Sequence, residues 1–97
     1  MSERIKMNFP LMEEMARTFR DGAGTLEEAE VGVKQIIQLL ADDTLLGQAG
    51  DALVDACASQ LSPAISRLQE KLIELAADVE AAKDNMLEAD RSAESLY

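Results

Sequence analysis

The feature that most restricts the fold of this chain is an uninterrupted apolar repeat in its second half. Apolar residues there alternate steps of four and three positions, at Leu61, Ile65, Leu68, Leu72, Leu75, Val79, Ala82, Met86, Ala89, Ala93 and Leu96. A heptad repeat of this kind predicts a long helix whose apolar seam packs against another helix with left-handed, coiled-coil-like geometry. The seam thins to alanine and methionine beyond Val79, so we expect packing to loosen towards the C-terminus.

The first half of the chain carries a second helical stripe. Phe9-Pro10 predicts a helix start, because proline in the first turn loses no helical hydrogen bond, and Asn8 is a suitable cap. Apolar residues then recur at helical spacing, at Met12, Met15, Phe19, Ala23, Leu26, Val33, Ile36, Ile37 and Leu40. The charged residues between them predict an amphipathic helix over about residues 9–41, with Glu13–Arg17 and Glu30–Lys34 as ion pairs within it.

A polar segment and a glycine, Asp42-Asp43-Thr44-Leu45-Leu46-Gly47, separate the two stripes. Aspartate and threonine compete with helical hydrogen bonding and favour caps and turns. Gly47 accepts the positive φ that a chain reversal requires. We therefore expect a turn over about residues 42–48 and a second helix over about residues 49–95, antiparallel to the first.

Pro63 interrupts the second predicted helix near its start. Inside a helix, proline removes one hydrogen bond and kinks the rod. Alternatively, Ser62 caps a new helix that has Pro63 at its first position. The apolar residues on either side keep one helical phase, which favours a single bent helix.

These elements predict one all-α domain over residues 1–97, an antiparallel helical hairpin. A lone hairpin leaves one apolar flank in water, whereas two hairpins dimerise into a four-helix bundle. We expect the partner interface to consist of Phe19, Leu26, Val33, Ile36, Leu40, Leu61, Ile65, Leu68 and Leu72. Both a homodimer and a heterodimer with a related helical hairpin are consistent with this pattern.

Charge and composition exclude several functions. The formal net charge is −10, a sign that repels nucleic acid and anionic lipid, so we expect no nucleic-acid partner and find no support for membrane contact. The chain has no histidine, and it shows no nucleophile–base pair, metal-ligand spacing or phosphate loop. We therefore expect no enzyme, no cofactor and no metal site. Cys57, the single cysteine, lies among small residues and is expected to pack as a small hydrophobic residue.

The N-terminal residues, MSERIKMNFP, lack the continuous apolar core of a signal peptide. No run in the chain approaches the ~20 apolar residues of a membrane-spanning helix. We expect synthesis in the cytoplasm and, for an exported protein, secretion without a cleaved signal peptide.

With these features the chain resembles the WXG100 (ESAT-6-like) family of type VII secretion substrates over nearly its whole length. The resemblance rests on the chain length, the hairpin plan, a midpoint turn and a C-terminal pattern. The midpoint reads Leu45-Leu46-Gly47, with leucine in place of the family's tryptophan. The tail pattern, hydrophobic-x-x-x-Asp/Glu-x-x-hydrophobic-x-x-x-hydrophobic, is filled by Met86, Asp90, Ala93 and Tyr97, with methionine in place of the usual tyrosine.

The resemblance implies export, as a folded pair of helical hairpins, through a membrane-embedded secretion ATPase that reads the tail as part of a signal. It implies a dimeric effector or a co-secreted partner without catalytic activity of its own. The alternative hypothesis is a cytoplasmic adaptor or chaperone that pairs with the helical N-terminal domain of a larger secreted toxin.

Overall fold

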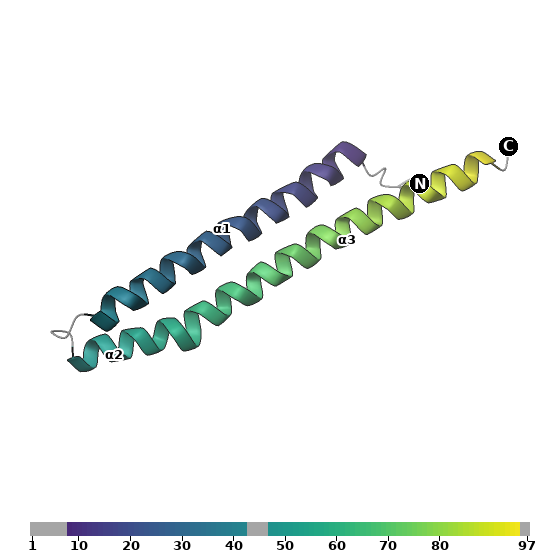
Figure 1. The fold of residues 1–97 in the computed structure, drawn as a ribbon. Coiled ribbons are helices and arrows are strands. Elements are labelled where there is room, and N and C mark those ends of the chain that lie inside the picture. Colours follow the sequence, from purple (N-terminus) through teal and green to yellow (C-terminus); the bar gives the residue numbers. More distant parts are fainter. Residues whose placement is uncertain (1–7, 43–46, 96–97) are drawn as a thin grey trace.

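The protein is a helical hairpin (Figure 1). A computed structural model describes residues 8–42 and 47–95, with side chains up to Arg91. The first arm is α1, Phe9–Asp42; the second comprises α2, Gly47–Ala56, the π-helical segment η1, Cys57–Leu61, and α3, Ser62–Ser95. The two arms run antiparallel, and the described residues contain no strand, so the predicted all-α hairpin is confirmed.

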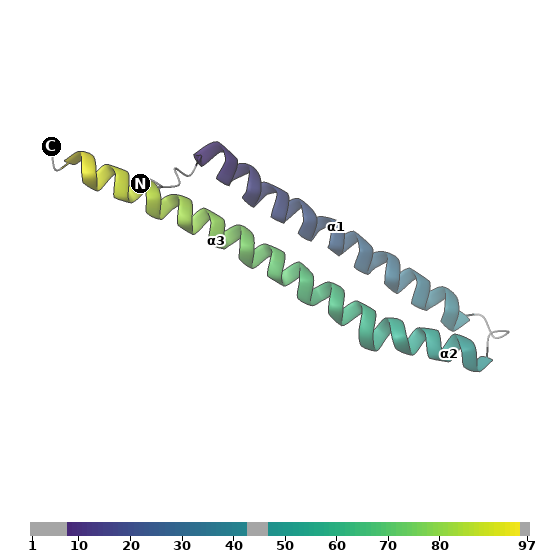
Figure 2. The ribbon, with the colours of Figure 1, turned by 180° about the vertical axis from the view of Figure 1, so that it is seen from behind.

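The hairpin is a rod with a single layer of helices. It measures 76 × 20 × 16 Å, and its radius of gyration is 21.6 Å, against about 13 Å for a compact domain of this length. Both ribbon views show α3 continuing past the start of α1 (Figures 1 and 2). In that overhang, Glu88, Ala89, Asp90 and Arg91 are all exposed. Within residues 8–42 and 47–95, no third element covers a second apolar flank of the two arms.

The ends of the helices follow local backbone chemistry. At the start of α1, the Leu11 N–H donates to Oδ1 of Asn8 (3.2 Å) and the Met12 N–H to the Asn8 carbonyl (2.9 Å), so Asn8 is the cap. Gly47, the first residue of α2, has φ 53°, a value that residues with a Cβ rarely adopt. Residues 43–46, including Leu45 of the expected turn motif, lie outside the described residues.

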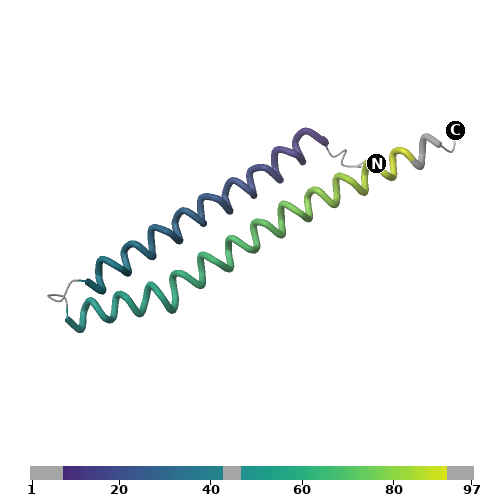
Figure 3. Tube along the Cα trace, viewed as in Figure 1, coloured from purple at the N-terminus to yellow at the C-terminus, as the bar shows by residue number. Residues whose placement is uncertain are grey.

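The second arm passes Pro63 through a short π-helical widening. Ser62 has helical dihedrals (φ −59°, ψ −47°), and its N–H donates to the carbonyl of Cys57, five residues back, so Ser62 is not the N-cap of a new helix. In a regular α-helix the Pro63 ring would clash with the carbonyl four residues earlier. The wider turn before the proline provides room for the ring. The helical path is therefore continuous, with a shallow change of direction at this segment (Figure 3).

The core between the arms is thin and made mostly of small side chains. Among the residues whose side chains are described, the buried apolar ones are Met12, Ala16, Ala23, Val33 and Ala76, and only Met12 is both large and fully buried. A Cβ added at Gly22 would lie 3.2 Å from Leu72 Cδ1, so the helices approach closely there. Such a core permits close packing but removes little apolar surface from water, and hydrophobic stabilisation scales with that area.

Candidate interaction surfaces

The two sides of the hairpin differ in chemistry. Residues seven positions apart lie on one line along a helix, because seven residues make almost two turns. On α1 the flanking lines are Met15, Gly22, Ala29 and Ile36 on one side, and Glu13, Arg20, Glu27 and Lys34 on the other. On the second arm, one equivalent line runs from Leu61 at the end of η1 through Leu68, Leu75 and Ala82 of α3. The other consists of Ser66, Ile73 and Glu80 of α3. Two antiparallel helices are related by a twofold axis that is perpendicular to the plane containing both helix axes. Rotation about this axis exchanges the helices but leaves each side of the hairpin on the same side. Equivalent lines on the two helices therefore lie on the same side of the hairpin.

The first side, which we call the apolar face, consists of Met15, Ile36, Leu53, Leu61 and Leu68. These side chains are between 40% and 51% exposed. Leu53 belongs to this face because it lines a groove of about 370 Å³ together with Leu61. Because large exposed apolar patches are typical of interaction sites, this face is the candidate interaction surface of the hairpin.

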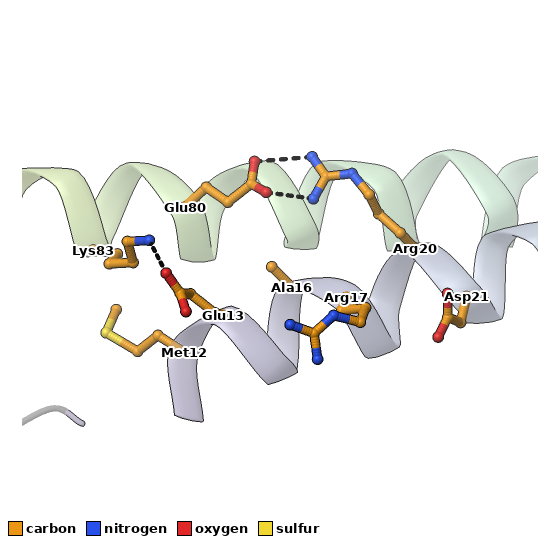
Figure 4. Close-up of a pocket in the computed structure, with 8 residues that line it drawn as sticks. All are labelled: Met12, Glu13, Ala16, Arg17, Arg20, Asp21, Glu80 and Lys83. Carbon is orange, nitrogen blue, oxygen red and sulfur yellow. Dashed lines mark hydrogen bonds and ion pairs between the residues drawn. The ribbon is translucent and has the colours of Figure 1, made fainter. Parts of the chain in front are cut away.

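The opposite side, which we call the ion-pair face, links α1 to α3 through Glu13, Arg20, Glu80 and Lys83 (Figure 4). The Arg20 guanidinium donates two hydrogen bonds to the Glu80 carboxylate, one of them 2.9 Å from Nη2 to Oε1. Lys83 Nζ donates to Oε2 of Glu13 at 2.6 Å. Bidentate arginine–carboxylate pairs add geometric specificity to attraction, so the Arg20–Glu80 pair favours one alignment of the two helices.

Both ion pairs border one open cleft of about 590 Å³. Its remaining lining residues are Met12, Ala16, Arg17 and Asp21 (Figure 4). The cleft has charged groups of both signs that are largely engaged with each other, so it offers no net charge to a small ion.

The two pairs shift the pKa values of their members in the direction that favours the charged forms. The hydrogen bond from Lys83 lowers the pKa of Glu13, and the hydrogen bond from Arg20 lowers the pKa of Glu80. The same bonds raise the pKa values of Lys83 and Arg20. A carboxylate with a lowered pKa contributes stability at neutral pH and loses it as the pH falls through that lowered pKa. The pairs therefore persist in mildly acidic solution.

The ion pairs expected within α1 are absent from the described residues. Glu13 bonds across the hairpin to Lys83 rather than along the helix to Arg17. No ion pair joins Glu30 to Lys34 within the described part of the chain. A charged residue on the flank of α1 also faces α3, so a partner across the hairpin competes with one along the helix.

The nine residues expected at a partner interface fall into three groups. Ile36, Leu61 and Leu68 lie exposed on the apolar face. Val33 is buried, at 7% exposed. The half-buried residues are Phe19, Leu26, Leu40, Ile65 and Leu72. The apolar seam predicted as one feature is thus divided, because part of it closes the hairpin and part remains in water.

The turn and tail positions lie at opposite ends of the rod. Gly47 begins α2, and Leu45 lies outside the described residues. In the tail, Met86 is half-buried and Asp90 is exposed on the overhang of α3. Ala93 is helical but its side chain is not described, and Tyr97 lies outside the described residues.

Five exposed apolar residues were not singled out from the sequence: Leu11, Val31, Leu39, Leu53 and Ile73. Leu11 and Leu39 stand four heptads apart on one line that also contains Thr18, Thr25 and Gly32, so their spacing was a readable signal. Val31 and Ile73 stand singly among polar positions and belong to no apolar repeat. Only the packed structure distinguishes such residues from core.

Within residues 8–42 and 47–95, no helix is long and apolar enough to cross a membrane. The same residues contain no group of three or more potential ligands, from Asp, Glu and Cys side chains, placed to hold a metal ion.

The described residues thus form a small all-α hairpin with one apolar face and an overhanging helix end. A family model, WXG100, "Proteins of 100 residues with WXG", matches residues 4–91. Because this match covers most of the chain, the protein belongs to the WXG100 family, and the resemblance noted in the sequence is confirmed. It is a small helical protein of the secreted, ESAT-6-like kind. No curated protein and no solved structure matches the chain.

Proposed function

We propose that this protein is a type VII secretion substrate that acts as an effector or co-secreted partner, forming one half of a four-helix bundle. The observation that carries the proposal is the apolar face, whose large side chains stand about half exposed along a rod with a thin core. Full burial of one such side chain contributes roughly 1.5–3 kcal/mol. A second helical hairpin laid on this face supplies the stabilisation that the single hairpin lacks.

The proposed partner is another helical hairpin, either a second copy or a related chain. Membership of the WXG100 family supports this pairing, because proteins of the family generally pair with partner hairpins. The interface we propose comprises the exposed members of the predicted set, Ile36, Leu61 and Leu68, together with Met15 and Leu53. Helices packed at this face would interdigitate their side chains in the coiled-coil manner.

The secretion ATPase is proposed to read the tail of α3. The overhang supports this role, because Asp90 stands exposed near the end of α3. An exposed helix end can enter a receptor groove without unfolding the hairpin. Met86, Asp90, Ala93 and Tyr97 are the proposed signal positions, with the turn at Leu45 and Gly47 of one hairpin packing beside the tail in the dimer.

The export proposal is tested by expressing the protein in cells with an intact or an inactivated secretion ATPase. We expect the protein in the culture medium only when the ATPase is intact, with a cytoplasmic marker protein absent from the medium in both cases. Retention inside cells that have an active machine would favour the alternative, a cytoplasmic adaptor or chaperone that pairs with the helical N-terminal domain of a larger toxin.

The tail proposal predicts a separation of folding from export. Asp90→Ala and Met86→Ala should each retain the helical circular dichroism spectrum but lower export roughly tenfold, as expected when a contact of ~1.4 kcal/mol with a receptor is lost. Glu88→Ala is the matched control, because Glu88 is exposed in the same overhang but stands outside the pattern. Unchanged export of both tail variants would show that Met86 and Asp90 are not part of an export signal.

A further inference from the structure

The outer edge of α1 carries a row of carboxylates along one border of the apolar face. Glu14, Asp21, Glu28 and Asp42 stand seven or fourteen positions apart, so they lie on one line of the helix, and Gln35 is the remaining member of that line. All five residues are exposed. We call the four carboxylates the acidic row.

The surroundings of Glu14 and Asp21 show where this row lies. Glu14 lines an open groove of about 250 Å³ together with Met15 of the apolar face. Asp21 borders the cleft of the ion-pair face, and its side chain points away from α3 (Figure 4). The row therefore follows the edge of α1 farthest from α3. In a four-helix bundle, this edge flanks the contact between α1 and the helix stacked on it, as the e and g positions flank the seam of a coiled coil.

The cations of α1 leave the acidic row largely without neutralisation. The basic residues of α1 are Arg17, Arg20 and Lys34. Arg20 and Lys34 stand on the line of the ion-pair face, where Arg20 is bound to Glu80. Arg17 stands within about one turn of two members of the row, but within the described residues no ion pair joins it to either. The row therefore presents a net negative charge to a neighbouring helix.

The equivalent edge of α3 has charges of both signs. It stands one position before the line of Leu68, as the acidic row stands one position before the line of Met15. Its members are Arg67, Glu74, Ala81 and Glu88. Beside it, Lys71 Nζ donates to Oε1 of Glu74 at 3.1 Å. A partner helix over α3 therefore meets both signs of charge along this edge, whereas one over α1 meets the carboxylates of the acidic row.

We propose that the partner on the apolar face is a different helical hairpin rather than a second copy, and that one of its helices carries lysine or arginine at intervals of seven positions along its edge. That helix lies along α1, where its basic side chains pair with Glu14, Asp21 and Glu28. This inference rests on the proposed four-helix bundle and specifies the chemistry of its second half. Charges that flank packed helices select partners by attracting the right helix and repelling the wrong one.

A second copy of the chain does not supply such an edge. With the turn of one hairpin beside the tail of the other, as proposed above, two copies would stack α1 on α1 and bring two acidic rows together. With α1 stacked on α3 instead, the row would meet one basic residue, Arg67, and two acidic ones, Glu74 and Glu88. Each copy would also bring a net charge of −10 to the bundle. Like charges placed across an interface weaken association.

The test uses the full chain and, as the probe partner, a variant of the same chain with a basic row: Glu14→Lys, Asp21→Lys and Glu28→Lys. Native mass spectrometry of an equimolar mixture distinguishes mixed pairs from self pairs by their mass. We expect the mixed pair to be at least roughly tenfold tighter than either self pair. Raising the salt concentration from about 50 mM to about 500 mM should reduce this preference, because salt screens exposed charges. Circular dichroism should show that each chain remains helical.

The matched control is a variant with Glu27→Lys, Glu70→Lys and Asp84→Lys. These three residues are also exposed, and their substitution changes the net charge equally, but none belongs to the acidic row or to the equivalent edge of α3. The unaltered chain should bind this control at least about fivefold more weakly than it binds the variant with the basic row. The comparison separates the position of the charges from the net charge of the chain.

The outcomes that overturn this inference differ from those that overturn the proposed bundle. A pair of unaltered copies as tight as the mixed pair, equal binding of the basic-row and control variants, or no mixed pair would overturn the inference. If Leu68→Asp dissociates that pair of unaltered copies, the four-helix bundle itself still stands. A mixed pair that persists with Leu68→Asp in both chains does not use the apolar face, and both proposals would then be wrong.

Discussion

The apolar face and the ion-pair face belong to the same two helices but use their side chains in different ways. On the ion-pair face, Arg20 and Lys83 find carboxylate partners on the opposite helix of the same chain. On the apolar face, Leu61 and Leu68 remain about half in water. The contrast shows that the single hairpin aligns its helices partly with directional polar contacts and retains exposed apolar surface. Covering that exposed apolar surface would contribute more free energy than the ion pairs do, because burial of apolar side chains stabilises more than exposed ion pairs.

The largest expected effect comes from placing a charge on the apolar face. Leu68→Asp would bury an unpaired carboxylate in the proposed four-helix bundle, a cost of about 3–5 kcal/mol. We expect association to weaken by more than roughly a hundredfold, as measured by light scattering on the purified chain or on a co-purified pair. The helical hairpin itself should survive, because Leu68 is already 50% exposed within it.

The matched control for this substitution is Ile73→Asp. Ile73 has nearly the same exposure but lies on the ion-pair face, so the variant should keep its association. A fully helical, associated Leu68→Asp protein, or a dissociated Ile73→Asp protein, would show that the two faces have been assigned the wrong way round.

A smaller effect on stability is expected from substituting two glycines of α1. Gly22 lies close to α3, whereas a Cβ at Gly32 would meet nothing within 4 Å. Gly32→Ala should raise the free energy of unfolding by about 0.5–1 kcal/mol, because glycine is a poor helix former and the new Cβ meets nothing within 4 Å. Gly22→Ala should gain less, because its Cβ would lie 3.2 Å from Leu72 Cδ1 and that side chain must shift. Urea unfolding followed by circular dichroism compares the two, and an equal or larger gain at Gly22 would contradict the close approach of α1 and α3.

The smallest effect is expected from the ion-pair face. Glu80→Gln should lower the unfolding midpoint slightly, and the difference from the unaltered protein should shrink in high salt, because both partners are exposed. Glu28→Gln, which removes a carboxylate that has no ion pair in the described residues, is the control. An effect of Glu80→Gln no larger than that of Glu28→Gln would mean that the pair contributes nothing to the fold.

The pH dependence of the same pairs has a definite sign. Because the pKa values of Glu13 and Glu80 are lowered in the folded protein, their contribution is present at neutral pH and is lost as the pH falls through those lowered values. Thermal unfolding should therefore show no loss attributable to these pairs until the pH falls into the ordinary carboxylate range, and the loss should continue down to the lowered pKa values. A loss near pH 6 that Glu80→Gln abolishes would contradict this assignment.

Much of the fold was predictable because it depends on local chemistry. The Asn8 cap and the positive φ of Gly47 follow from the conformational preferences of single residues. The turn at Leu45 stays a prediction, since it lies outside the described residues. The proposed site was less predictable. The spacing of apolar residues defines a stripe along each helix, but it does not say how many other helices pack against that stripe. Ile36 and Val33 appeared equivalent in the sequence, yet Ile36 is exposed and Val33 is buried.

The sequence by itself determined that this protein is a two-armed helical rod, because the period of its apolar residues and the turn chemistry near Gly47 act over a few neighbouring positions. Only the tertiary structure decided which half of the seam closes the hairpin and that Glu13 pairs with Lys83 rather than Arg17. Those outcomes depend on the alignment of helices whose contacting residues stand fifty to seventy positions apart in the chain. That alignment is set by close packing of small residues such as Gly22 against Leu72, which no local preference specifies.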